Sequence, residues 1–346
     1  MISISVCMIV KNEANVLRRC LDSLQGLYEE LIIVDTGSTD ETKHIASEYT
    51  DLIYDFTWID DFAAARNFAF SKATKDYIYS ADADEMLDEE NRRRFLELKQ
   101  CLLPEVEIVQ MQYLTQTEFN TTENYSCDYR PKLYKRLRKF TWIDPIHESV
   151  NLTPVVFESD IEILHLPESN HGKRDFHVFR KALAKGQTLS NKLQRMYARE
   201  LMMAGTEEDF AKAEQNFLIL ALADDVDEPE EMHTIGYIIL SHLQRLRCAD
   251  AEFFKWAMKS ICTKPCSEIC MEIGNYYFER QDFQEAMVWF VNAMQETEPV
   301  LLSDSKTRQP LARMVDCYEQ LANQDELMAE FYRDEAENYR RKMDIL

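Results

Sequence analysis

The sequence predicts two domains: an α/β domain with a mainly parallel sheet over residues 1–170, and an all-α domain of helical repeats over residues 171–346. Two observations predict this division. In the first half, short apolar stretches alternate with amphipathic helical patterns, as they do in strand–helix–strand units. From about Asp175 onward, helical patterns follow one another and aromatic residues recur at intervals of 36 or 37 residues. Such a period is typical of stacked helix pairs.

The composition is that of a globular chain, with 46% hydrophobic and 29% charged residues among 346, enough for two separate cores. The net charge of −23 disfavours general binding to nucleic acid or to anionic membranes, because both need a positive surface. No apolar run approaches the roughly 18 residues that a membrane-spanning helix requires. The first residues lack the basic region and apolar core of a secretion signal, so we expect a cytoplasmic protein.

The first strand is expected over Ile2–Val10, which alternates and then becomes wholly apolar, as a strand covered on both faces does. Lys11, Asn12 and Glu13 follow as a polar elbow. Apolar residues at helical spacing then predict an amphipathic helix over residues 14–24. Ligands of parallel α/β sheets bind where strands end, so the elbow is a candidate binding segment.

A second buried strand is expected over Leu31–Val34, with a helix from about Glu41 to Glu48 behind it. Ser38 or Thr39 is the expected N-cap of that helix. Asp35 follows the strand directly, where its carboxylate can accept hydrogen bonds from ribose hydroxyls or from a base imide. Asp35 is therefore a candidate nucleotide-binding residue.

Arg66 lies early in the helix predicted for AAARNFAFSKA. The helix dipole does not favour a cation at a helix start. We therefore expect Arg66 to face either an anionic substrate or a neighbouring carboxylate, Asp82 or Asp35.

Two aspartates follow the apolar strand at Tyr77–Tyr79: Asp82 and Asp84, with Glu85 directly behind them. Carboxylates crowded at one strand end repel each other unless a cation lies between them. Oxygen ligands suit Mg²⁺ or Mn²⁺, and an ion held by so few carboxylates is usually completed by substrate phosphates. The pattern indicates a site for a metal-bridged nucleotide diphosphate; the alternative is a polar junction with solvated acids.

Four segments together, SVCMIVKNEANVLRRCLDSL, IIVDTGSTDET, DFAAARNFAF and DADE, resemble the nucleotide-sugar half of a family 2 glycosyltransferase with the Rossmann-like GT-A fold. The resemblance covers about the first 100 residues. It implies that Lys11, Asn12, Glu13 and Asp35 contact the base and ribose of a donor such as a UDP-sugar.

The same resemblance implies that Asp82 lies beside the ribose and that Asp84 holds a Mn²⁺ or Mg²⁺ ion on the diphosphate. It also implies inversion by a single in-line displacement, which needs a general base. Members of this family often carry an IHE at the place of His147 and Glu148, so Glu148 is the expected base. His147, or His165 beyond a later strand, would contact the metal or the leaving diphosphate; the alternative is a structural role for both histidines.

A basic run covers residues 130–139, six of which are Lys or Arg in an otherwise acidic chain. Such a run is usually a solvated face. The functional alternative is a local counter-charge for a diphosphate or for an acidic acceptor.

The second half carries a tetratricopeptide pattern between Ile269 and Pro299, formed by Ile273, Gly274, Tyr277, Ala286, Phe290 and Ala293. Phe254 precedes Phe290 by 36 residues and Phe217 precedes Phe254 by 37, which supports two degenerate repeats upstream. Stacked repeats form concave surfaces. We expect this surface to hold a peptide or protein, with a homodimer or a bare structural appendage as the alternatives.

Three functions follow from these patterns. The first is a metal-dependent inverting glycosyltransferase that transfers a hexose or N-acetylhexosamine to a Ser, Thr or Cys of a peptide or protein, a domain pairing similar to bacterial flagellin or peptide glycosyltransferases. The second keeps the enzyme but makes the acceptor a cell-surface polysaccharide or a lipopolysaccharide core. The third is an inactive, repeat-based scaffold that binds a protein partner.

Overall fold

The computed structural model describes residues 1–115, 128–146, 149–150, 154–166, 172–186, 188–223 and 227–344. The chain divides into two compact units, Met1–Ala182 and Leu183–Leu346. The first is an α/β unit and the second consists of helices, as the sequence predicts. Each unit is described by itself.

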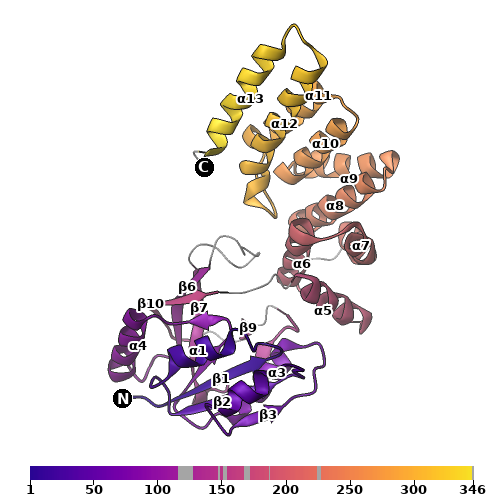
Figure 1. Cartoon of the computed structure of the whole chain (residues 1–346). Helices are drawn as coiled ribbons and strands as arrows, with labels where there is room; N and C mark the ends of the chain where they lie inside the picture. The colour runs from indigo at the N-terminus through magenta and orange to yellow at the C-terminus, as the bar shows by residue number, and fades with distance from the viewer. Residues whose placement is uncertain are drawn as a thin grey trace. The chain divides into compact units, whose positions relative to one another are not determined.

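The first unit is built on one mixed sheet of eight strands in the order β3-β2-β1-β4-β7-β6-β10-β5 (Figure 1). Its strands, and the short pair β8 and β9, are β1 (Ile4–Val10), β2 (Glu30–Asp35), β3 (Ile53–Asp55), β4 (Tyr77–Ala81), β5 (Glu85–Met86), β6 (Ile108–Thr115), β7 (Asp128–Lys135), β8 (Trp142–Ile143), β9 (Ser149–Val150) and β10 (Val156–His165). Strands β3, β2, β1 and β4 run parallel to one another, as do β6 and β10. Strand β7 is antiparallel to both of its neighbours, and β5 is antiparallel to β10. The parallel strands β1, β2 and β4 therefore end at the same edge of the sheet.

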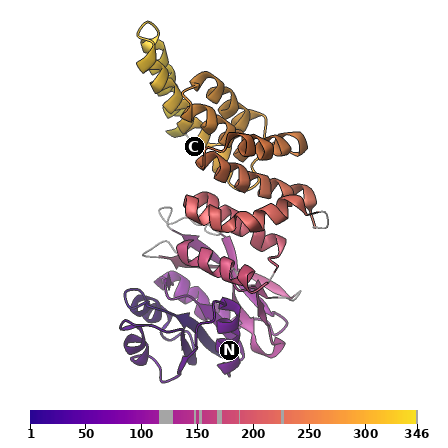
Figure 2. The same ribbon diagram turned by 90° about the vertical axis from the view of Figure 1, so that its right-hand side faces the viewer.

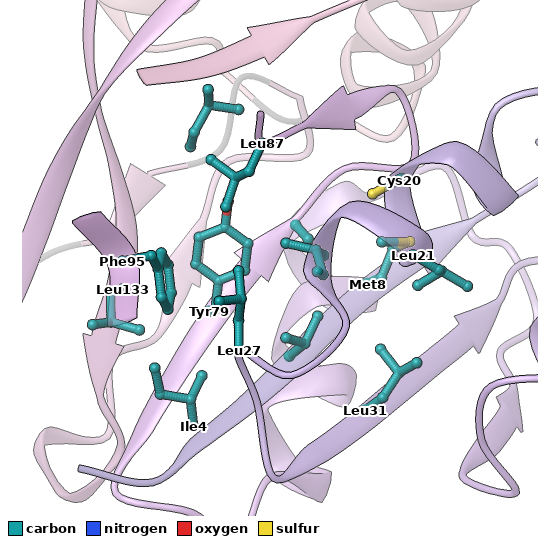
Figure 3. Close-up of a cluster of buried hydrophobic side chains, with 14 of the residues drawn as sticks. Ile4, Met8, Cys20, Leu21, Leu27, Leu31, Tyr79, Leu87, Phe95 and Leu133 are labelled. Atoms are coloured by element: carbon teal, nitrogen blue, oxygen red, sulfur yellow. The ribbon is translucent and has the colours of Figure 1, made fainter. Parts of the chain in front are cut away.

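Helices cover both faces of this sheet. They are α1 (Leu17–Leu24), α2 (Thr42–Ser47), α3 (Phe62–Lys72) and α4 (Glu89–Cys101), with a short 3-10 helix at Arg136–Arg138. Helix α5 (Gly172–Ala184) follows β10 in the chain, and the division between the two units falls within it. On one face, alternate residues of β1 pack with α1 and α4, and Phe95 lies beside Tyr79 with ring centroids 5.5 Å apart (Figure 3). On the other face, Cys7 and Ile78 pack against α3. Burial on both faces explains why β1 and β4 are almost continuously apolar.

Two local expectations need correction. The first helix begins at Leu17 rather than at residue 14, because residues 14–16 form a turn. Neither Ser38 nor Thr39 caps α2: Ser38 Oγ accepts from the backbone N–H of Asn12 at 2.9 Å, and Thr39 N–H donates to Asn12 Oδ1 at 2.8 Å. Their polar groups bond the elbow after β1 to the elbow after β2. N-cap preferences consider only neighbours along the chain and do not predict such a contact.

The second unit is a succession of helices (Figure 2). They are α6 (Asn191–Ala204), α7 (Glu207–Leu222), α8 (Pro229–Leu246), α9 (Asp250–Thr263), α10 (Ser267–Glu279), α11 (Phe283–Gln295), α12 (Arg308–Gln324) and α13 (Ala329–Asp344), with a 3-10 helix at Ser303–Ser305. Gly274 allows α10 and α11 to approach, since a Cβ there would lie 2.4 Å from Cε1 of Phe290. A glycine at position 274 therefore lets these two helices pack closely.

A buried ion network links α8 to α10. Glu272 is 3% exposed, and its carboxylate accepts from Arg245 Nε at 2.7 Å and lies 2.9 Å from His242 Nδ1. Burial alone would raise the pKa of Glu272, but His242 and Arg245 outweigh it and lower the pKa to about 2. The network therefore stabilises this unit only while the carboxylate is charged.

Within the described residues, every helix is too short or too polar to pass through a lipid bilayer.

Candidate functional site

The expected binding residues gather where β1, β2 and β4 end. Val10, the last residue of β1, pairs with Asp35 of β2, and Met8 pairs with Ala81, the last residue of β4. The polar residues that follow these strands therefore lie along one edge of the sheet, where ligands of α/β folds bind.

Asp35 is 3% exposed, and backbone amides hold its carboxylate. Gly37 N–H donates to Oδ2 at 3.1 Å, and Ser38 N–H lies 3.2 Å from Oδ1 and 3.1 Å from Oδ2. Gly37 has φ +103°, a backbone conformation that glycine adopts without strain. A donor group of a ligand would share this carboxylate with the turn.

The elbow after β1 is tied to the elbow after β2. Asn12, with φ 57°, bonds Ser38 and Thr39, and the backbone N–H of Glu13 donates to Thr42 Oγ1 at 2.7 Å. Lys11 is exposed beside them. Lys11, Asn12 and Glu13 thus lie beside Asp35 at this edge of the sheet. Polar atoms of Asn12 and Glu13 already bond the second elbow.

Asp82, directly after β4, is paired with two cations of the protein. Arg66 of α3 donates from Nη2 to Asp82 Oδ1 at 2.9 Å and from Nη1 to Ser80 Oγ at 2.9 Å. Lys132 Nζ of β7 lies 3.5 Å from Asp82 Oδ2. Burial alone would raise the pKa of Asp82, but Arg66 and Lys132 lower it well below its ordinary range.

This pairing corrects the charge argument made from the sequence. Repulsion between Asp82 and Asp84 does not by itself require a metal ion, because Arg66 and Lys132 supply the counter-charge for Asp82. Arg66 was expected to face an anionic substrate or a neighbouring carboxylate, and in the structure it contacts the carboxylate of Asp82. A metal ion at this edge of the sheet would therefore be held by Asp84 rather than by Asp82.

Asp84 and His165 converge from two different elements. Asp84 Oδ2 lies 3.1 Å from His165 Nε2, and the backbone carbonyl of Asp84 accepts from Leu166 N–H at 2.9 Å. The contact arises because β5 pairs with the end of β10, where Glu85 lies opposite His165. Both side chains are mostly buried, with 19% and 13% of their surfaces exposed.

A divalent ion fits this donor pair. A carboxylate oxygen and an imidazole nitrogen are both ligands that Mn²⁺ accepts, and the carboxylate also suits Mg²⁺. Among the residues that the structure describes, no group of three or more Asp, Glu, His or Cys side chains is placed so that it could hold a metal ion. An ion held by Asp84 and His165 would take its other ligands from phosphate oxygens and water.

The sequence did not predict Glu85 and Lys132 as site residues. Glu85 is 3% and Lys132 is 5% exposed, and the Lys132 ammonium donates to the Glu85 carboxylate. Burial raises the pKa of Glu85 to about 7 even though Lys132 lowers it. Lys132 belongs to the basic run, four of whose other cations contact backbone carbonyls, Glu107 or an aromatic ring, and only the fold distinguishes it from them.

His147 and Glu148 lie outside the described residues. Their expected roles, as a metal or diphosphate contact and as general base, stay predictions.

Comparison with known proteins finds similarities in the first unit. The family described as glycosyl transferase family 2 matches residues 5–151. A TPR repeat-containing protein of Synechococcus elongatus is 49% identical over 87 residues, 25% of this chain and 22% of that protein. The SPbeta prophage-derived glycosyltransferase SunS of Bacillus subtilis is 32% identical over 102 residues, 29% of this chain and 24% of that protein.

The matching stretches thus span about a quarter of the length of these two curated relatives. Among solved structures, glucosyl-3-phosphoglycerate synthase from Mycobacterium tuberculosis in complex with Mn²⁺ and UDP-glucose has a TM-score of 0.39 and 13% identity, covering 55% of this chain and 81% of that chain. A likeness at that level is too low to support an argument about ligands.

Proposed function

We propose a sugar-transfer function from the premise that residues 5–151 are a glycosyl transferase family 2 domain. The protein takes a hexose or N-acetylhexosamine from a UDP-linked sugar and passes it with inversion to a Ser, Thr or Cys of a peptide or protein. The observation that carries this proposal is the convergence of Asp84 and His165, at 3.1 Å, beside the edge where Asp35 and Asp82 lie.

The donor would be bound by residues from three strand ends. Asp35 and the elbow of Lys11, Asn12 and Glu13 would face the base and ribose, and Asp82, held in place by Arg66, would face a ribose hydroxyl. Asp84 and His165 would hold a Mn²⁺ or Mg²⁺ ion, which when bound neutralises the diphosphate that leaves.

The reaction exchanges one bond at the anomeric carbon for another. The bond from that carbon to the diphosphate oxygen breaks, the acceptor oxygen or sulfur forms the new bond on the opposite face, and the acceptor proton passes to a base. Glu148 is the proposed base because a carboxylate of suitably raised pKa is a good proton acceptor in such a step. His147 is proposed as a second contact to the metal or the leaving diphosphate.

The acceptor proposal rests on the second unit. Helix pairs that pack closely, as where Gly274 lies against the ring of Phe290, form concave surfaces that bind extended peptides. A homodimer through the same helices is the alternative use of that surface.

The donor half of the proposal is tested with Asp84→Asn. Because asparagine keeps the shape but removes the charge that faces the ion, the variant should lose more than about tenfold in UDP affinity with Mn²⁺ present and little without it. Calorimetric titration of UDP with and without Mn²⁺ measures both. If the variant and the wild type bind UDP equally at saturating Mn²⁺, Asp84 holds no ion.

The acceptor half is tested by incubating the full chain with labelled UDP-sugars and, separately, with peptides and with cell-surface glycans. Label in Ser-, Thr- or Cys-containing peptides supports the proposal. Label in glycans alone would make the polysaccharide or lipopolysaccharide core the acceptor. Failure to bind any nucleotide sugar would leave the inactive scaffold as the function.

A further inference from the structure

Lys132 occupies a β-bulge of strand β7. Leu133 pairs with Val109 of β6 and Pro131 pairs with Gln110, so Lys132 is the extra residue between the two pairs. A bulge bends its strand and redirects the side chain of the extra residue, and bulges are frequent beside active sites. This explains how one residue of a basic run, whose other cations are exposed or half-buried, enters the interior.

The bulge aims the ammonium at the segment that follows β4. Lys132 Nζ lies 3.2 Å from the carbonyl oxygen of Ser80 and 3.5 Å from Asp82 Oδ2, and it donates to Glu85. Glu85 in turn accepts from the backbone N–H of Asp82 at 3.2 Å. Lys132 and Glu85 therefore hold both the main chain and the carboxylate of Asp82.

The three acids of this segment consequently differ in what they face. Both oxygens of Asp82 are engaged by protein cations, Oδ1 by Arg66 at 2.9 Å and Oδ2 by Lys132 at 3.5 Å. Glu85 is engaged by Lys132. Asp84 contacts His165 instead.

We propose that Lys132 is a positioning residue that withholds Asp82 and Glu85 from the metal ion, so that Asp82 stays on the ribose side and Asp84 is the carboxylate that faces the ion. The inference rests on the proposed function. Without Lys132, the acids of this segment would have one remaining protein cation, Arg66. Asp82 Oδ2 and Glu85 would be released from their partner, and the segment would attract a divalent ion in the absence of any nucleotide.

The test uses the full chain and two calorimetric titrations, Mn²⁺ alone and UDP at saturating Mn²⁺. Lys132→Met keeps much of the side-chain length but removes the charge. It should bind Mn²⁺ alone about tenfold more tightly than the wild type, and UDP about tenfold more weakly. Lys132→Arg should stay near the wild type in both. These opposed changes separate positioning from damage to the fold, which would weaken both affinities.

A double variant, Lys132→Met with Glu85→Gln, leaves no unpaired buried charge and so protects the test against misfolding. It removes one cation and its buried acidic partner together. Mn²⁺ affinity should return to within about threefold of the wild type. UDP affinity should stay reduced, because Asp82 still lacks the contact with the Lys132 ammonium. If UDP affinity also recovers, Lys132 does not position Asp82.

Lys99→Met is the matched control. Lys99 is 2% exposed and donates to Leu27 O and Glu29 Oε1, both at 2.8 Å. Its loss should lower the melting temperature and leave both affinities unchanged. Unchanged Mn²⁺ affinity in Lys132→Met would overturn this inference alone, whereas a wild type that binds neither Mn²⁺ nor UDP would overturn the proposed function with it.

Discussion

At the scale of single residues, Asp82 and Asp84 are one residue apart yet sit in different electrostatic surroundings. Asp82 faces Arg66 and Lys132, and Asp84 faces a histidine. Arg66 also stacks on Trp142, with its Cζ 5.2 Å from the ring centroid. A cation held by a carboxylate, a hydroxyl and an aromatic ring is fixed in direction, which suits a group that orients a ligand-binding carboxylate.

Arg66→Met should therefore weaken UDP binding in the presence of Mn²⁺ by about tenfold or more. It should also lower the stability of the first unit by about 1–2 kcal/mol, less than for a fully buried pair, because 34% of the Asp82 side chain is exposed and Lys132 still faces it. The Arg66 side chain is 14% exposed. Calorimetry with UDP and urea unfolding measure the two effects.

Arg18→Met provides the control for this prediction. Arg18 also pairs with a carboxylate, Glu48, but both side chains are more than 40% exposed, so the pair contributes little. The control should match the wild type in UDP affinity. A folded Arg66→Met variant with unchanged UDP affinity would show that Asp82 does not need Arg66 to bind the donor.

At the scale of elements, the link between α8 and α10 depends on a charged group in the interior. Glu272 holds Arg245 and His242, and its pKa is lowered to about 2 from an ordinary value of 4.5. A lowered carboxylate pKa gives stability that is complete above the ordinary pKa and is lost as the pH falls toward the folded-state value.

Glu272→Gln should therefore destabilise the second unit by about 3 kcal/mol at pH 7, the equivalent of the 4.5 to 2 difference. The difference between variant and wild type should shrink between pH 4.5 and about 2. Urea unfolding followed by circular dichroism across that range measures it. Glu298→Gln, at a side chain 81% exposed, should show no such trend; a constant penalty for Glu272→Gln across the range would contradict the assignment.

Most elements were predictable because their causes are local. Short apolar runs indicate β1, β2 and β4, helical periodicity indicates α1 with its one buried face, and the repeat interval indicates the helix pairs. The errors occur where distant groups compete for local ones: Ser38 and Thr39 bond Asn12 instead of capping α2. The bulge at Lys132 is also invisible to pattern reasoning, since it depends on the register between β6 and β7.

At the scale of the whole molecule, two units with separate cores carry the proposed donor and acceptor roles. The donor residues belong to Met1–Ala182 and the helix pairs to Leu183–Leu346. Compact units with their own cores unfold as separate cooperative transitions unless a strong interface couples them.

Scanning calorimetry of the full chain should therefore resolve two transitions. UDP with Mn²⁺ at about 100 times its dissociation constant should stabilise only the first unit, by about 2.7 kcal/mol, or roughly 5–10 °C. Glu272→Gln should lower only the other transition. One transition that responds to both changes would mean that the units unfold together.

The sequence by itself determined the strands β1, β2 and β4, the change from strands and helices to helices alone, and the acid pair after β4, because each depends on neighbours along the chain. The tertiary structure alone decided which groups face those acids. His165 meets Asp84 across 81 residues and Lys132 meets Glu85 across 47. Strand pairing and a bulge bring these side chains together, and the resulting charges, rather than the spacing of the acids, separate the carboxylate proposed for the ribose from the one proposed for the metal.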